Sequence, residues 1–231
     1  MIGATADDRF PEPVVTTSNL APEAVALDDA AVAPAARRLV RRPFAVMLAS
    51  SLLSLVASFV LSVDAVRLAA NPDVALSCNI NAAISCGKVA VAWQASLFGF
   101  PNAFLGLVTE PVVITIAVAA LAGVRFPRWF MLAAQAVYLL GLVFAYWLFT
   151  QSYFVIGALC PWCLLVTAST TTVFTSLLRV NLLQNNFGLR PRVYERAASL
   201  LRTGVDYAVV AVIFVLLTAA IVVKYQHELF G

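Results

Sequence analysis

Four cysteines are the residues of this 231-residue chain whose type and spacing can do chemistry. Cys78 and Cys86 are separated by seven residues, and Cys160 and Cys163 enclose Pro161 and Trp162 in a Cys-Pro-Trp-Cys motif. In thiol–disulfide exchange, a thiolate attacks a disulfide sulfur and passes through a mixed disulfide. Two separated cysteine pairs therefore favour a relay of such exchanges.

The Cys-Pro-Trp-Cys motif stands at the predicted start of an apolar helix. Pro161 suits the first helical position, where its missing N–H has no helical partner to lose. Cys160 then lies at about the N-cap, where the helix dipole and the free N–H groups stabilise a thiolate. Cys163 follows on about the same face, one turn deeper. We expect Cys160 to meet water and protein partners, and Cys163 to meet a molecule dissolved in lipid.

Two unreactive uses of the cysteines stay open. The four thiols could hold a structural zinc ion, although a Cys-x7-Cys spacing is unusual for one. They could also form two inert disulfides, although a Cys-x-x-Cys pair at a helix start is usually reactive. The alternative to a redox enzyme is therefore a membrane transporter or a metal-binding scaffold with structural disulfides.

The composition indicates a membrane protein. Hydrophobic residues make up 62% of the chain and charged residues 12%, whereas soluble domains are about half apolar and a quarter charged. The apolar residues form five blocks of about 20 residues, long enough to cross a bilayer. Each block must be a helix, because lipid offers its backbone groups no other partner. The blocks are residues 44–66, 101–123, 128–150, 157–178 and 204–224.

These blocks predict an all-α integral membrane fold. Residues 1–42 have no apolar periodicity and are predicted to be a disordered cytoplasmic tail. Residues 43–178 are predicted to form a four-helix bundle, with the cysteine loop 67–100 over its outer mouth. A basic cytoplasmic loop at 179–203 then leads into a peripheral fifth helix and a short outer tail at 204–231.

The basic residues predict the orientation. Of the fifteen Lys and Arg, all but Arg67, Lys88 and Lys224 fall in the tail, in the 124–128 turn or in the 179–203 loop. By the positive-inside rule the N-terminus is cytoplasmic and all four cysteines face outward, across the cell's inner membrane. Disulfides form and persist on that side.

Three motifs together resemble the vitamin K epoxide reductase family. They are CNINAAISC from Cys78 to Cys86, the Leu-Phe-Gly triplet around Phe98, and CPWC from Cys160 to Cys163. The resemblance covers roughly residues 44–178. Bacterial members of that family oxidise a periplasmic thioredoxin-like partner and reduce a membrane quinone. Some carry the partner as a fused domain; because this chain ends at Gly231 after the fifth helix, we expect a homologue without that fusion.

The resemblance implies a role for each cysteine. Cys163 would act on the quinone, with Cys160 as its disulfide partner. Cys86 would attack Cys160 to pass electrons inward, and Cys78 would exchange with the extracytoplasmic thioredoxin-like thiol oxidase. The quinone, menaquinone or ubiquinone, would be a diffusible substrate, and no metal is expected.

We expect the quinone to contact Phe98, Trp162 and Thr167. Two positions depart from the animal relatives: Thr167 stands where they have a tyrosine, and Ala95 where they have a quinone-binding asparagine. Glu110 lies in mid-membrane, and its role stays open between proton delivery to the reduced quinone and a neutral acid hydrogen-bonded inside the bundle.

The segment between the loop cysteines and the second apolar block has an amphipathic pattern. Val89, Trp93 and Leu97 recur at helical spacing. This pattern predicts a short interfacial helix that lays its apolar face on the bilayer surface. An irregular loop anchored by Trp93 alone is the other interpretation.

Overall fold

The computed structural model describes the backbone of residues 21–230 and the side chains of residues 40–226. Apart from its connecting loops, that part of the chain is helical, as predicted. A 3-10 helix at Trp93–Ser96 and a π-helical turn at Gln151–Ile156 accompany the α-helices. The α-helices are α1 Ala21–Ala70, α2 Cys86–Ala90, α3 Ala103–Leu121, α4 Arg128–Thr150, α5 Pro161–Leu183, α6 Pro191–Thr203 and α7 Val205–Phe230.

Five segments of the described helices are long and apolar enough to cross a membrane, so the chain is a multi-pass membrane protein. They correspond to the five predicted blocks, with ends that differ by up to six residues. The segments are Val40–Ala70, Ala103–Leu121, Arg128–Ile156, Pro161–Leu183 and Val205–Gln226.

Two segments predicted to be irregular are helical. Helix α1 already begins at Ala21, so the disordered tail was wrong for residues 21–42, whereas residues 1–20 lie outside the described part. Alanine, which is frequent here, has the highest helix propensity of all residues. In the basic loop, α5 continues to Leu183 and α6 spans Pro191–Thr203. The next residue, Gly204, caps α6 in the left-handed conformation that glycine adopts readily.

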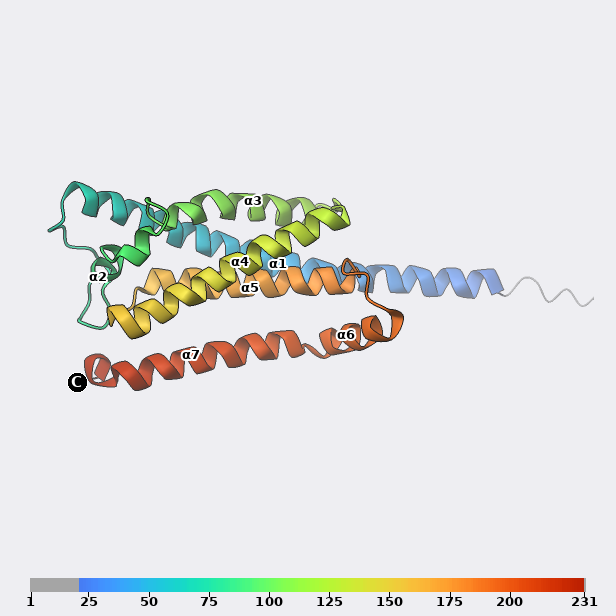
Figure 1. Cartoon of the computed structure of the whole chain (residues 1–231). Helices are drawn as coiled ribbons and strands as arrows, with labels where there is room; N and C mark the ends of the chain where they lie inside the picture. The colour runs from blue at the N-terminus through green and yellow to red at the C-terminus, as the bar shows by residue number, and fades with distance from the viewer. Residues whose placement is uncertain (1–20, 231) are drawn as a thin grey trace, which may run out of the picture. The chain divides into compact units, whose positions relative to one another are not determined.

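Helices α3, α4 and α5 run alongside one another from the end that carries α2 to the end that carries α6 (Figure 1). A core of buried apolar side chains joins them to α1 in the half away from the cysteine loop. Met47 of α1, Ile116 of α3, Met131 of α4 and Leu177 of α5 are among its members. Their burial fixes the bundle on which the cysteine loop rests.

Helix α7 lies along α5. No residue in its most apolar stretch is buried, as expected of a helix at the periphery of the bundle. Its last turns nevertheless contact the cysteine end. Tyr225 joins Ala83 and Leu159 in a small apolar cluster, with Ile221 against it. The Tyr153 hydroxyl also donates a hydrogen bond to the backbone oxygen of Ala220, 3.0 Å away. The fifth helix therefore supports the loop from one side.

The segment between the loop and α3 is not one helix. Helix α2 ends at Ala90, and Ala92 is extended (ψ 142°) before the 3-10 helix begins at Trp93. Val89 is buried against the cysteines, whereas Trp93 is 63% exposed and meets Trp147 edge-on. The break separates Val89 and Trp93, which were predicted to lie on one face.

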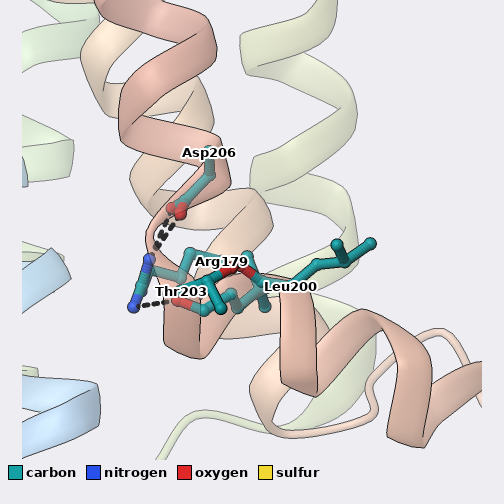
Figure 2. Close-up of polar contacts among 5 residues, drawn as sticks. Arg179, Leu200, Thr203 and Asp206 are labelled. Carbon is teal, nitrogen blue, oxygen red and sulfur yellow. Dashed lines mark hydrogen bonds and ion pairs between the residues drawn. The ribbon is translucent and has the colours of Figure 1, made fainter.

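At the opposite end a buried ion pair joins α5 to α7. The Arg179 guanidinium donates to both carboxylate oxygens of Asp206, at 2.6 and 2.7 Å, and to the backbone oxygen of Leu201 at 2.7 Å (Figure 2). The Thr203 hydroxyl donates to the backbone oxygen of Leu200 nearby. Because these bonds converge at the α6–α7 junction, they fix where α7 starts.

Candidate active site

Backbone pairing brings the loop cysteines to the start of α5. The N–H of Ser85 donates to the oxygen of Leu159 (3.0 Å), and the N–H of Leu159 donates to the oxygen of Ala83 (2.7 Å). This parallel bridge pairs Ile84, two residues before Cys86, with Leu159, the residue before Cys160. The two cysteines are thereby placed side by side, although they are 74 positions apart in the sequence.

Two asparagines hold the loop in shape. The Asn81 side-chain oxygen accepts from the N–H groups of Ala83 and Ile84, and the Asn79 side-chain oxygen accepts from the N–H of Gly87. Asparagine commonly stabilises turns in this way, by bonding to nearby backbone groups. Because these bonds flank Cys86, they fix the position of its sulfur.

The four sulfurs form a chain from the loop to the start of α5. Cys78 and Cys86 form a disulfide, while Cys160 and Cys163 are free thiols. The sulfur of Cys160 lies 3.3 Å from that of Cys86. Cys160 is the N-cap of α5 and Pro161 its first residue, as predicted, and the N–H of Cys163 donates to the Cys160 sulfur at 3.4 Å.

The helix start also makes Cys160 acidic. The pKa of its thiol is lowered from the usual range, chiefly because the Cys163 side chain hydrogen-bonds to its sulfur. Burial opposes this effect, and the backbone N–H groups of Cys163 and Trp162 strengthen it. A thiol with a lowered pKa leaves a disulfide readily when another thiolate attacks.

The expectation that Cys160 would meet water directly was wrong. It is 2% exposed, and Cys86 and Cys78 are 1% and 6% exposed. The reason is that α2 and the loop pack over the start of α5, a tertiary contact that helix position alone cannot reveal. Cys163 is half-buried. The three buried sulfurs can therefore exchange bonds with one another away from water.

A cavity of about 700 Å³ lies beneath the loop, between α1, α3, α4 and α5. Cys86, Cys160 and Cys163 line it, so it opens directly onto the reactive sulfurs. Most of its wall is apolar, as in typical sites for small organic molecules, whose volumes are about 300–1,000 Å³. The polar side chains in the wall include Gln94, Asn102, Thr109, Glu110, Thr167 and Thr170.

Residues 45–178, which hold all four cysteines and the helices around the cavity, match the model of the vitamin K epoxide reductase family. The chain belongs to this family. Its members are membrane oxidoreductases, which agrees with free thiols that face an apolar cavity. No curated protein sequence matches the chain.

Of the three residues expected to contact a quinone, the structure brings two to the cavity. Phe98 and Thr167 line it, whereas Trp162 does not and instead packs against the apolar cluster around the cysteines. Trp162 follows the proline at the helix start. The Thr167 hydroxyl donates to the backbone oxygen of Cys163, 2.9 Å away, as threonines inside helices commonly do.

The sequence analysis missed two amides in the cavity wall. The Asn102 side chain donates to the backbone oxygen of Gln94 (2.6 Å) and accepts from the N–H of Leu97 (3.2 Å). Gln94, 3% exposed, donates in turn to the side-chain oxygen of Gln151. Ala95, where animal relatives have an asparagine, also lines the cavity, so Asn102 supplies an amide seven residues later. The signal available in the sequence was the presence of two polar amides, Gln94 and Asn102, near the start of an apolar block.

Glu110 is buried in α3 and forms part of the cavity wall. The Tyr138 hydroxyl of α4 donates to its carboxyl group at 3.4 Å. Ser51 and Ser54 of α1, both 0% exposed, lie beside the same carboxyl group. A hydrogen-bonded acid in the cavity wall is compatible with both roles considered for Glu110, which are proton delivery to the reduced quinone and a neutral acid held inside the bundle.

Proposed function

We propose that this chain is a membrane thiol:quinone oxidoreductase. It oxidises an extracytoplasmic thioredoxin-fold partner through a disulfide relay and reduces a membrane quinone, and so supports disulfide-bond formation. One observation carries the proposal: the loop disulfide, the Cys160 thiol 3.3 Å away and the Cys163 thiol in the cavity wall form one path for electrons.

The relay transfers two electrons at a time. A partner thiolate attacks Cys78, which frees the Cys86 thiolate to attack Cys160 in a Cys160–Cys163 disulfide, and Cys163 leaves. The second partner thiol releases Cys78, and Cys78 then attacks Cys86, so that Cys160 leaves in turn. The partner ends as a disulfide, and Cys160 and Cys163 end as thiols. The pairing in the structure, with the loop disulfide closed and the other two thiols free, corresponds to this stage.

The quinone would then receive the electrons in the cavity. Two thiols and one quinone give one disulfide and one quinol, so electrons and protons balance without a metal. Cys163 lines the cavity together with Cys86 and Cys160. Phe98 would stack on the quinone ring, since aromatic rings prefer offset or edge contacts with one another. Thr167 and Asn102 would provide polar groups for the carbonyl oxygens.

A protein partner needs the loop to open. Cys78 is 6% exposed, whereas Ile80, two residues along, is 68% exposed. An exposed apolar side chain beside a reactive cysteine suits contact with the apolar surface around a thioredoxin-fold active site. We infer that partner docking at Ile80 displaces this edge of the loop and uncovers Cys78.

The distribution of basic residues supports an orientation in which the cysteines face the extracytoplasmic side of the membrane. The exposed Arg125 and Arg128 lie at the connection between α3 and α4, and the arginines of α6 lie at the same end of the bundle. Arginine and lysine accumulate on the cytoplasmic side of membrane proteins. The cysteine end would then face the oxidising compartment.

The direct test is anaerobic quinone reduction by the purified full-length chain. A reduced thioredoxin-fold protein with a Cys-x-x-Cys site serves as donor, and decylubiquinone or a short-chain menaquinone as acceptor. We expect one quinol for each donor disulfide formed. If neither quinone is reduced although all four thiols can be labelled, the function is wrong and the transporter or scaffold alternative is favoured.

A further inference from the structure

A buried acid lies next to the outermost cysteine of the relay. Asp64 of α1 is 6% exposed, and its carboxylate oxygen lies 4.0 Å from the sulfur of Cys78. On the same helix, Leu61 and Leu68 pack against the cluster that contains the cysteines. Residues three and four apart share one helix face, so Asp64 faces the cysteines. An acid within a membrane segment is energetically unfavourable and by default indicates a function.

The charged groups around Asp64 are few in the described part of the chain. Arg67, one turn further along α1, is exposed, and Lys88 of α2 is exposed and donates to the backbone oxygen of Ala82. Asp73 is an exposed loop acid, and the thiols of Cys160 and Cys163 belong to α5 and its N-cap. The charge of Asp64 also acts on the sulfur of Cys160. Asp64 is therefore close enough to act on both cysteine pairs.

One step of the relay needs a base at this place. When the partner leaves, Cys86 is joined to Cys160, and the Cys78 thiolate that is released takes up a proton at neutral pH, the usual state of a free thiol there. Only a thiolate attacks a disulfide, so Cys78 must lose its proton before it can close the loop. With Cys78, Cys86 and Cys160 all nearly buried, bulk water is poorly placed to accept that proton.

We propose that Asp64 is the general base that deprotonates Cys78 for loop closure. This inference rests on the proposed function. It adds a catalytic residue to that function, because Asp64 acts directly on the reacting sulfur of Cys78. The Asp64 carboxylate takes the proton from Cys78, the new thiolate bonds to the sulfur of Cys86, and the bond between Cys86 and Cys160 breaks. Cys160 leaves as a thiolate and recovers a proton from Asp64, so no outside oxidant or acid is needed. The structure holds the product of this step.

The test starts from fully reduced protein mixed anaerobically with excess decylubiquinone. The first quinol comes from Cys160 and Cys163, and the second needs electrons from Cys78 and Cys86 through the relay. In Asp64→Asn we expect an unchanged first phase and a second phase slowed about 10²-fold near neutral pH, the usual size of general-base catalysis. The defect should shrink above about pH 8.5, where free thiols ionise without help.

Trapping and matched variants complete the test. Acid quenching and alkylation between the phases should find the Cys86–Cys160 disulfide accumulated in Asp64→Asn. Asp64→Glu should retain most of the second phase, and Asp73→Asn, which changes an exposed loop acid, should behave as wild type. An unchanged second phase in Asp64→Asn, or a defect equal at every pH, would overturn the base role. Absence of the first phase in wild type would instead refute the proposed function, and this inference with it.

Discussion

The two ends of the bundle use polar groups in different ways. At the end with α6, the Arg179 guanidinium donates to both oxygens of Asp206 and to one backbone oxygen. Asn181, 0% exposed, donates to Gln135 and accepts from Asn186. These bonds join α4, α5 and α7, and nothing in the proposed reaction requires them to change.

At the cysteine end, the polar and sulfur groups surround open space. The cavity reaches three sulfurs, and the shortest distance between the two pairs is 3.3 Å. Backbone bonds between Ser85, Leu159 and Ala83 hold the loop there. The comparison indicates a division of labour: one end fixes the helices, and the other keeps bonds that can be exchanged.

The largest expected effect is loss of turnover on replacing Cys160 with Ser. Cys160 is the sulfur between the loop pair and Cys163, so without it neither the relay nor the disulfide with Cys163 can form. We expect quinone reduction at the uncatalysed background, measured by quinol absorbance under anaerobic conditions.

Cys78→Ser is the matched control for that change. Its reduced form should still yield one quinol from Cys160 and Cys163 but not a second. If the Cys160 variant kept substantial turnover, the exchange path through the helix start would be wrong.

At the opposite end, Asp206→Asn should reduce stability while leaving the chemistry intact. It leaves the buried Arg179 charge without its carboxylate, a loss of about 3 kcal/mol for a buried pair. Thermal unfolding in detergent should show the lower stability, whereas the first quinol phase at low temperature should keep its wild-type rate.

The exposed Arg196→Ala provides the comparison for this ion pair, since it removes an arginine from α6 without disturbing a buried contact. It should unfold as wild type does. A marked loss of the first quinol phase in Asp206→Asn would show that the two ends are coupled, against the division proposed above.

The smallest expected effect is at a helix contact between the two ends. Gly106 of α3 lies so close to Ser58 of α1 that a methyl group there would overlap the serine side chain. Gly106→Ala should destabilise the bundle by about 1–2 kcal/mol, an overpacking loss reduced by the higher helix propensity of alanine. Chemical unfolding in mixed micelles would measure it.

Gly141→Ala on α4 is the control, because its new methyl group would meet only Thr170, at an ordinary distance of 4.0 Å. It should leave stability unchanged or raise it by up to about 1 kcal/mol, because alanine favours a helix more than glycine does. Equal effects of the two substitutions would mean that α1 and α3 can separate easily. The close contact between these two helices would then not be a fixed part of the bundle.

Much of the fold follows from the sequence because lipid permits few solutions. An apolar segment in a bilayer must satisfy its own backbone bonds, so five such blocks predict five helices. The proline after Cys160 likewise predicts the helix start, since it fits only the first position there. The helix at residues 21–42 was missed because its apolar residues have no periodicity, while its alanines favour a helix without any.

What only the tertiary structure decided is which side chains meet. Cys160 is covered because the loop pairs with the residue before it, and Asp64 meets Cys78 because α1 turns that face toward the loop. Trp162 stays outside the cavity, while Asn102, which the sequence analysis did not single out, forms part of its wall. Spacing along a helix fixes which residues share a face, but the direction of that face depends on helix packing. The sequence thus determined the reactive sulfurs, and packing determined the acid and the cavity that surround them.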